Sequence, residues 1–259
     1  MRKKLKNPPL NELIIGVYFN PPLLDIYTHH VGIFWDKIRD RYPQIEQRDT
    51  LGNMFFESPN EVFPMPRFWL TSKDKSHLLQ LQRNALLLNW RRGPNTAYPS
   101  FEPVKEEFDK IFSVFLNFVR SINPDTTVSI DRAELAYMNI VEPSEYWKSV
   151  SDVVTIIPSI SPISMGVPET SLEAFNFSQT MNVEPRLSVN VTVRSGSKLP
   201  ENVPILQFDI RAVGALDGAT KVEVDEWFAR AHLATGNVFH AVTSTEIRNL
   251  HWNQESDAN

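Results

Sequence analysis

The chain has 259 residues, of which 42% are hydrophobic and 22% are charged, and its formal net charge is -5. This composition is typical of a globular protein that buries a sizeable core in one large domain or two fused small ones. No stretch approaches the ~18–20 consecutive apolar residues of a membrane span, and the basic start leads to prolines instead of an apolar signal core. We therefore expect a cytoplasmic protein without a membrane partner.

Cysteine is absent from the sequence. This excludes disulfides, thiolate nucleophiles and zinc–thiolate sites, so any chemistry has to come from histidine, carboxylate, hydroxyl or lysine side chains. The acidic balance argues against nucleic acid as the main partner, because counterion release requires clustered lysine and arginine.

The first half begins with a predicted strand and helix. Residues 13–19 form an apolar, β-branched run that ends at prolines, which indicates a buried strand. Thr28 is positioned to cap a helix that continues to about Arg41, before Pro43. Short candidate strands follow at 54–56, 67–71, 78–82 and 86–90.

A hairpin and a long helix complete this half. Arg83-Asn84 separates two apolar runs and indicates a tight turn, since asparagine tolerates a left-handed backbone. Between Phe101 and Ile122 the apolar positions recur at threes and fours, which predicts an amphipathic helix with Ser100 as its N-cap and Asn123-Pro124 as its end.

The second half repeats this order. An extended segment at 128–141 and a short helical stretch near 145–152 precede 158–168, which we interpret as an irregular loop rich in proline and serine. Alternating strands are predicted at 175–183, 187–194 and 205–213, followed by a helix at about 224–241 and a capping box at 243–246 that opens a last short helix.

The predicted fold class is therefore α+β, with a strand–helix–antiparallel strands–helix unit that occurs twice. The first unit covers 1–123 and the second covers 124–259 with a loop insertion at 158–170, and we expect both to form one compact domain. In outline this order is similar to the duplicated curved sheets of the TATA-box-binding-protein fold and the helix-grip folds. Such sheets carry long helices on one face, and their fold alone does not fix function.

Several sequence blocks resemble a known family. They are residues 7–19, 80–92 and 98–101, and a closing pattern of Asp225-Glu226-Trp227-Phe228, His232, Phe239 and Trp252. Together they are similar to the sporadically distributed bacterial family known as TIGR04255, over residues 7–252. Where that family often has an Arg-Tyr pair before an asparagine of its middle strand, this chain has Ala136-Tyr137-Met138-Asn139. The resemblance implies one fold of about this length and a patchy bacterial distribution that suits accessory or defence-linked genes, and it brings no catalytic residues.

Two groups of residues are candidate ligand-binding sites. If the strand alternation holds, the polar face of the second sheet gathers Arg132, Arg186, Asn190, Arg194, Asp209 and Arg211, with Gln207 and Glu134 nearby. Two interpretations are open for this set: it binds an anionic ligand or a partner's acidic segment, or it is a solvated sheet face with cross-strand ion pairs. The second group is Trp90, Arg91 and Arg92 at a strand end, where stacking or phosphate contact competes with simple solvation.

Enzyme signatures are absent. The sequence has no phosphate loop, dinucleotide fingerprint, serine elbow or zinc-protease motif, so we expect no cofactor and no metal. The adjacent His29-His30 has poor ligand spacing, and His232 is expected to form a hydrogen bond between helix and sheet. Asp131, Glu134 and Asp209 are the strand carboxylates that a metal-dependent hydrolase or nuclease would need.

Three functions follow as hypotheses. The first is a non-enzymatic interaction protein, a subunit or an antitoxin- or immunity-like partner in a bacterial defence system, whose protein partner contacts exposed aromatics among Phe63, Trp69, Trp147 and Trp252. The second is a sensor of an anionic small molecule or nucleotide, with a pocket lined by Arg132, Arg186, Asn190 and Arg211. The third is the metal-dependent hydrolase or nuclease.

Overall fold

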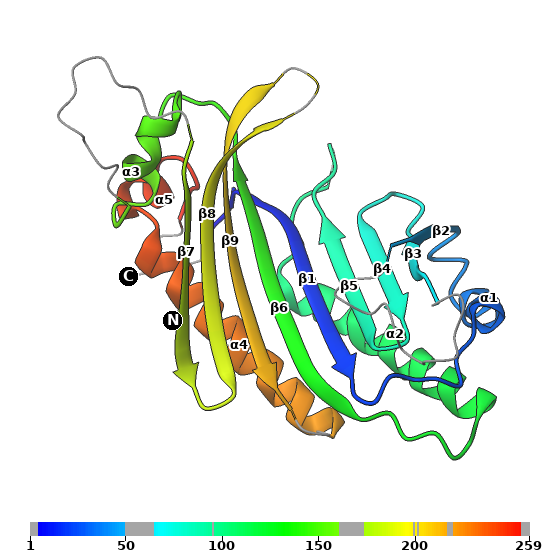
Figure 1. The fold of residues 1–259 in the computed structure, drawn as a ribbon. Helices are drawn as coiled ribbons and strands as arrows, with labels where there is room; N and C mark the ends of the chain where they lie inside the picture. Colours follow the sequence, from blue (N-terminus) through cyan, green and yellow to red (C-terminus); the bar gives the residue numbers. More distant parts are fainter. Residues whose placement is uncertain are drawn as a thin grey trace. The chain divides into compact units, whose positions relative to one another are not determined.

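The computed structural model describes residues 5–49, 65–94, 96–160, 174–198, 200, 202–216 and 220–254. The strands form an antiparallel sheet in the order β2-β3-β4-β5-β1-β6-β9-β8-β7 (Figure 1). By contacts the chain divides into two compact units. Unit 1 comprises residues 1–11, 136–212 and 230–259, and unit 2 comprises residues 12–135 and 213–229. In the described part of the chain, no helix is both long and apolar enough to cross a membrane.

The element order confirms the predicted α+β class and the repeated strand, helix, antiparallel strands and long helix. The strands are β1 (Leu10–Phe19), β2 (Gln44–Arg48), β3 (Arg67–Thr71), β4 (His77–Gln82), β5 (Ala85–Arg91), β6 (Ile130–Val141), β7 (Asn176–Glu184), β8 (Leu187–Lys198) and β9 (Val203–Ala215). The helices are α1 (Thr28–Asp36), α2 (Phe101–Ile122), the short 3-10 helix η1 (Val150–Asp152), α3 (Val153–Ile156), α4 (Lys221–Val242) and α5 (Thr245–Leu250).

The best-predicted elements have strong local signals. Helix α2 has the predicted bounds, with Asn123-Pro124 at its end, because its apolar residues share one stripe and proline cannot continue a helix. The hairpin of β4 and β5 turns at Arg83-Asn84, as predicted. In β8, the alternate residues Leu187, Val189, Val191 and Val193 are buried, which confirms the predicted alternation.

Helix caps differ from the predictions. Tyr27, and not Thr28, is the N-cap residue of α1, and the helix ends at Asp36, earlier than expected. Ser100 occupies the N-cap position of α2, but its hydroxyl donates to Glu102 instead of accepting from a helix amide. At α5 the cap is Ser244, whose side chain accepts a hydrogen bond from the Ile247 amide, one residue after the predicted capping box would place it.

Phenylalanines of α2 form the core of unit 2. Phe115 stacks on Phe19 of β1 with ring centroids 5.6 Å apart, and it also meets Phe34 of α1 edge-on. Phe108 contacts Phe228, at the start of α4. All these rings are at most 3% exposed, and each fully buried side chain of this size contributes about 1.5–3 kcal/mol. Helix α2 therefore covers the sheet face that carries the odd-numbered side chains of β1.

Candidate functional site

The opposite face of the unit 2 sheet carries polar and aromatic side chains. Residues paired directly across antiparallel strands point to the same face. Trp69 of β3 pairs with Glu46 of β2 and Gln80 of β4, and Arg91 of β5 pairs with Glu12 of β1. Glu12 lies seven residues before Phe19 in β1, so these side chains point away from α2.

Three arginines surround Trp69 on this face. The guanidinium carbons of Arg48, Arg91 and Arg67 lie 4.6, 5.2 and 5.4 Å from the centre of the indole ring. They come from β2, β5 and β3, so that strand pairing alone collects them around one ring. Guanidinium groups at such distances are attracted by the ring quadrupole, which offsets part of their mutual repulsion. We call Arg48, Arg67, Trp69 and Arg91 the arginine–tryptophan cluster.

A chain of side-chain hydrogen bonds across β3, β4, β5 and β1 holds the cluster in place. Arg67 Nη1 donates to Gln80 Oε1 at 3.0 Å, and Gln80 Nε2 donates to Asn89 Oδ1 at 2.8 Å. Asn89 Nδ2 and Arg91 Nε both donate to Glu12 Oε1 at 2.8 Å. Gln80 and Asn89 are 6% and 3% exposed, so the amides are held without competition from solvent. The positions of Arg67 and Arg91 are therefore set by four adjacent strands.

Two hydrogen-bond donors of the cluster have no acceptor in the described part of the chain. Among the described residues, neither Arg67 Nε nor Trp69 Nε1 has a hydrogen-bond partner, although both atoms are buried. Arg48 pairs with Glu46 and Arg91 pairs with Glu12, whereas the hydrogen bond of Arg67 goes to a neutral amide. Burial lowers the pKa of Arg67; the nearby Asp49 carboxylate opposes this and the Arg48 guanidinium adds to it. Unsatisfied buried donors beside a guanidinium favour an oxygen-bearing anion as their partner.

The predicted Trp90-Arg91-Arg92 group does not act as a unit. Trp90 is 1% exposed, and its ring packs 5.1 Å from Tyr98 on the face opposite to Arg91. Arg91 joins the arginine–tryptophan cluster, and Arg92 lies exposed beyond the end of β5. The indole beside Arg91 is thus Trp69, from a strand two positions away in the sheet.

The predicted polar face of unit 1 exists, but its members are engaged with neighbouring strands. Asn190 donates to Ser178 and Thr180 of β7 at 3.1 and 2.9 Å. Arg194 lies 3.9 Å from Asp209, in an ion pair whose arginine is 49% exposed and which contributes little stability. Arg211 lies on the same face of β9 as Asp209, and Arg186 occupies the β7–β8 turn with φ 64°.

Arg132 belongs to unit 2. Its guanidinium lies 4.1 Å over the Tyr18 ring, and the Tyr18 hydroxyl donates to Glu134 at 2.8 Å. Asp131 and Glu134 are three residues apart on β6 and so point to opposite faces, so they do not converge as a metal-dependent hydrolase or nuclease would need. In the described ranges, no three histidine, aspartate or glutamate side chains form a group able to hold a metal.

Two of the four aromatics proposed for a partner surface are buried, and Trp69 is half-buried. Trp147 and Trp252 are 0% and 2% exposed, so that part of the prediction is wrong, and Phe63 lies outside the described residues. Trp252 stacks on Phe208 of β9 in the core of unit 1. The prediction for His232 is confirmed: its Nδ1 lies 2.6 Å from the Tyr137 hydroxyl, which joins α4 to β6 within unit 1.

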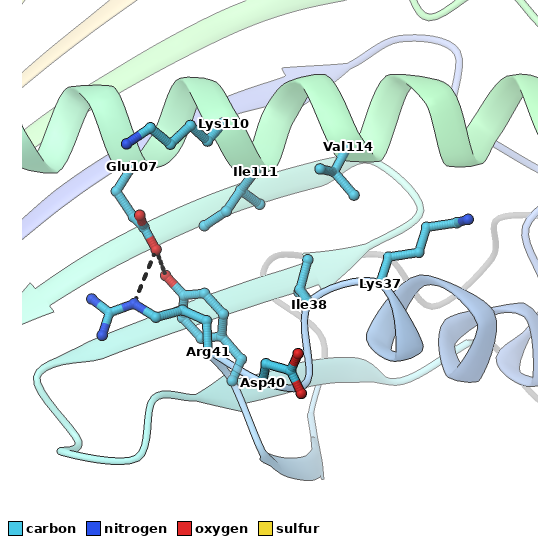
Figure 2. A pocket seen from close by; sticks show the side chains of 9 residues that line it. Lys37, Ile38, Asp40, Arg41, Glu107, Lys110, Ile111 and Val114 are labelled. Carbon is cyan, nitrogen blue, oxygen red and sulfur yellow. Dashed lines mark hydrogen bonds and ion pairs between the residues drawn. The ribbon is translucent and has the colours of Figure 1, made fainter.

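A small cavity of about 230 Å³ lies between the segment after α1 and helix α2 (Figure 2). Figure 2 shows Glu107 of α2 pointing toward Arg41, and Glu107 Oε1 accepts hydrogen bonds from Arg41 Nε at 3.3 Å and the Tyr42 hydroxyl at 2.9 Å. The cavity is smaller than the ~300–1,000 Å³ of most small-molecule sites, and its central charges neutralise each other.

A larger cavity of about 430 Å³ lies between the end of α2 and the start of α4. Its walls include Arg120, Thr126, Thr127 and Lys221. The Lys221 ammonium already forms ion pairs with Asp109 at 2.9 Å and Asp225 at 2.6 Å. Of the two cationic side chains of this cavity, Lys221 is therefore already neutralised by carboxylates of the protein. The arginine–tryptophan cluster is the better candidate, because two of its donors are buried and have no acceptor within the described part of the chain.

Comparisons with known proteins add little to this geometry. No protein-family model matches the chain, and no curated protein matches it. Among solved structures, the chain is similar to the di-domain ARO/CYC StfQ from the steffimycin biosynthetic pathway, with 10% identity over 88% of this chain and 95% of that chain. The TM-score of 0.18 is too low to support a shared fold or function.

Proposed function

We propose that this chain is a non-enzymatic binding protein that holds an anionic small molecule on the sheet face of unit 2 that points away from α2. The observation that supports it is the arginine–tryptophan cluster, where three guanidinium groups from three strands surround one indole and two buried donors lack a partner among the described residues. A carboxylate or phosphate oxygen would satisfy Arg67 Nε and Trp69 Nε1 together and reduce the repulsion among the arginines.

The cluster is built for binding and not for catalysis. Its charged groups are arginines, and a guanidinium supplies neither a general base nor a nucleophile, while Glu12 accepts hydrogen bonds from Asn89 and Arg91. A serine, a histidine and an aspartate do meet elsewhere in unit 2. There, Ser76 Oγ lies between His77 Nδ1 and Asp74 Oδ2, at 2.8 and 2.7 Å, and Ser76 is 2% exposed. A nucleophilic triad needs the histidine in the middle and an accessible serine.

Ligand binding should be measured first by thermal shift against inorganic phosphate, nucleotides and small carboxylates. A ligand at a hundred times its dissociation constant stabilises the folded state by about 2.7 kcal/mol. We expect the shift to disappear in Arg67→Gln and to persist in Arg132→Gln, which removes a guanidinium from another aromatic ring of the same unit. No shift with any of these anions, or equal loss in both variants, would refute the proposal.

Trp69 offers a second readout. Ligand bound at the cluster changes the environment of its indole, so tryptophan fluorescence should respond to the same anion that stabilises the protein. Trp69→Phe should abolish this response, whereas Trp35→Phe should leave it intact because the Trp35 indole already donates to the Tyr42 carbonyl oxygen at 2.8 Å. A fluorescence change that survives in Trp69→Phe would place the ligand elsewhere.

A further inference from the structure

Strand β7 is an edge strand of the sheet, next to β8 (Figure 1). One side of β7 pairs with β8, and on the other side no strand of the described residues pairs with it. In such an edge strand, alternate backbone N–H and C=O groups point outward without a ladder partner. An edge of this kind is a template for another strand.

The common devices that protect an edge strand are missing from residues 176–182. This segment contains no charged residue and no proline. Its pairing with β8 is regular from Asn176, opposite Arg194, to Asn182, opposite Ser188, and the register shift comes only after Asn182. Phe177 is 39% exposed, although it lies opposite the buried Val193. Lysine, proline or a bulge would normally interrupt such an edge.

The same segment is complementary to itself. Its middle residue is Gln179, and in an antiparallel pairing of two copies about Gln179 each residue meets a chemically similar one. Phe177 would lie opposite Met181, Ser178 opposite Thr180, and Asn176 opposite Asn182. Sulfur–aromatic contacts and hydroxyl or amide pairs across strands are favourable, and an uncharged segment does not repel its own copy.

We propose that two copies of this chain associate through β7, antiparallel and with the two-fold axis at Gln179. The contact is isologous, so one strand supplies both halves of the interface and closes the exposed edge. It involves unit 1 residues that play no part in the arginine–tryptophan cluster, so the two proposals stand independently.

Because the chain lacks cysteine, single cysteines test this register directly. In Gln179→Cys the two thiols would face each other across the axis, and mild oxidation should give a covalent dimer of twice the 29.8 kDa chain mass. Asn176→Cys should give no covalent dimer when it is oxidised alone, because position 176 of one copy would lie six residues, or about 20 Å, from position 176 of the other. An equimolar mixture of Asn176→Cys and Asn182→Cys should again give dimers.

Light scattering over a range of protein concentrations tests the association without cross-linking. We expect the mass of the wild-type chain to rise toward the dimer, and Phe177→Lys to hold it at the monomer. Leu250→Lys makes the same change at another exposed apolar residue of unit 1, on α5, and should still dimerise. A wild-type mass that stays at 29.8 kDa, or Asn176→Cys dimers that form as fast alone as in the mixture, would overturn the proposal.

Discussion

The Tyr42 hydroxyl donates a hydrogen bond of 2.9 Å to Glu107 Oε1 and so joins the segment after α1 to helix α2. Tyr42 is 1% exposed, and the Glu107 side chain is 22% exposed. The phenol is therefore a buried donor to a partly buried carboxylate, a type of bond stronger than one between neutral groups.

Tyr42→Phe should lower the free energy of unfolding by about 1–2 kcal/mol, because it removes a charge-assisted hydrogen bond while keeping the ring. The midpoint of urea unfolding measures this loss. Tyr27→Phe serves as a control because Tyr27 is 51% exposed, and its midpoint should barely move. Equal effects in both variants would contradict a specific role for the bond to Glu107.

The same phenol should make the fold sensitive to alkali. Burial, and then the Glu107 charge, raise the pKa of Tyr42 well above its ordinary value. Its contribution is thus complete below the ordinary tyrosine pKa of about 10 and is lost as the pH rises beyond it, because only the unfolded chain then releases the proton. The unfolding free energy should fall less steeply above pH ~10 in Tyr42→Phe than in the wild type.

Asp74 should make the stability of the protein depend on pH in the acid range, with a sign opposite to that of Tyr42. Hydrogen bonds from the Ser72 hydroxyl at 2.6 Å and from the hydroxyl and amide of Ser76 hold its pKa well below the ordinary value. Its contribution is present above the ordinary aspartate pKa of about 4 and is lost as the pH falls below it. Thermal unfolding of Asp74→Asn should depend less on acid pH than the wild type, whereas Asp40→Asn, at an exposed residue, should follow the wild-type curve.

Lys75 occupies the turn between β3 and β4 with φ 60°. A left-handed backbone strains any residue with a Cβ, so Lys75→Gly should raise the unfolding free energy by about 1 kcal/mol. Lys73→Gly in the same turn should lower it by a few tenths of a kcal/mol, since glycine there only adds freedom to the unfolded chain. Chemical denaturation of both variants tests this, and a loss of stability in Lys75→Gly would contradict the prediction.

Gly16 of β1 has to be glycine because the Leu87 side chain packs closely against its Cα. A Cβ on this residue would lie 2.7 Å from Leu87 Cγ, and Leu87 is 2% exposed and cannot move into solvent. Gly16→Ala should therefore destabilise the protein by about 1–3 kcal/mol through overpacking.

Gly32 of α1 provides a control of opposite sign. A Cβ there meets nothing within 4 Å, so Gly32→Ala should stabilise the protein by about 0.5–1 kcal/mol through its helix propensity. Urea unfolding of the two alanine variants should give shifts in opposite directions, and a shift of the same sign would contradict the role of Leu87.

How far the sequence predicts the fold depends on how local each signal is. Helix α2 follows from its apolar stripe and Asn123-Pro124, and the β4–β5 hairpin from two apolar runs around Arg83-Asn84. The sequence does not predict strand β2, because all five of its residues are exposed and no apolar alternation marks it. Edge strands of this kind are formed by their neighbours more than by their own composition.

The candidate site depends on information that no single segment contains. The alternation of Arg67 and Trp69 in a predicted strand places both on one face, and the same rule places Trp90 and Arg91 on opposite faces. Arg48 and Arg91 reach Trp69 only through the pairing of β2, β3, β4 and β5, which a sequence pattern does not give. The predicted site was therefore incomplete: of Trp90, Arg91 and Arg92, only Arg91 lies in the cluster.

The pairing of β1 with β5 affects how unit 2 folds. Strands β3 to β5 follow one another along the chain and pair in that order through short turns, whereas residues 49–66 separate β2 from β3. Strand β1 precedes them all, yet its Leu13 pairs with Trp90 of β5, and this contact must close the whole intervening chain. Loop closure of that length is slow and costs more entropy. We therefore expect pulsed hydrogen exchange to show β4 and β5 protected early and β1 late, so that Glu12 is added last to the polar network behind Trp69.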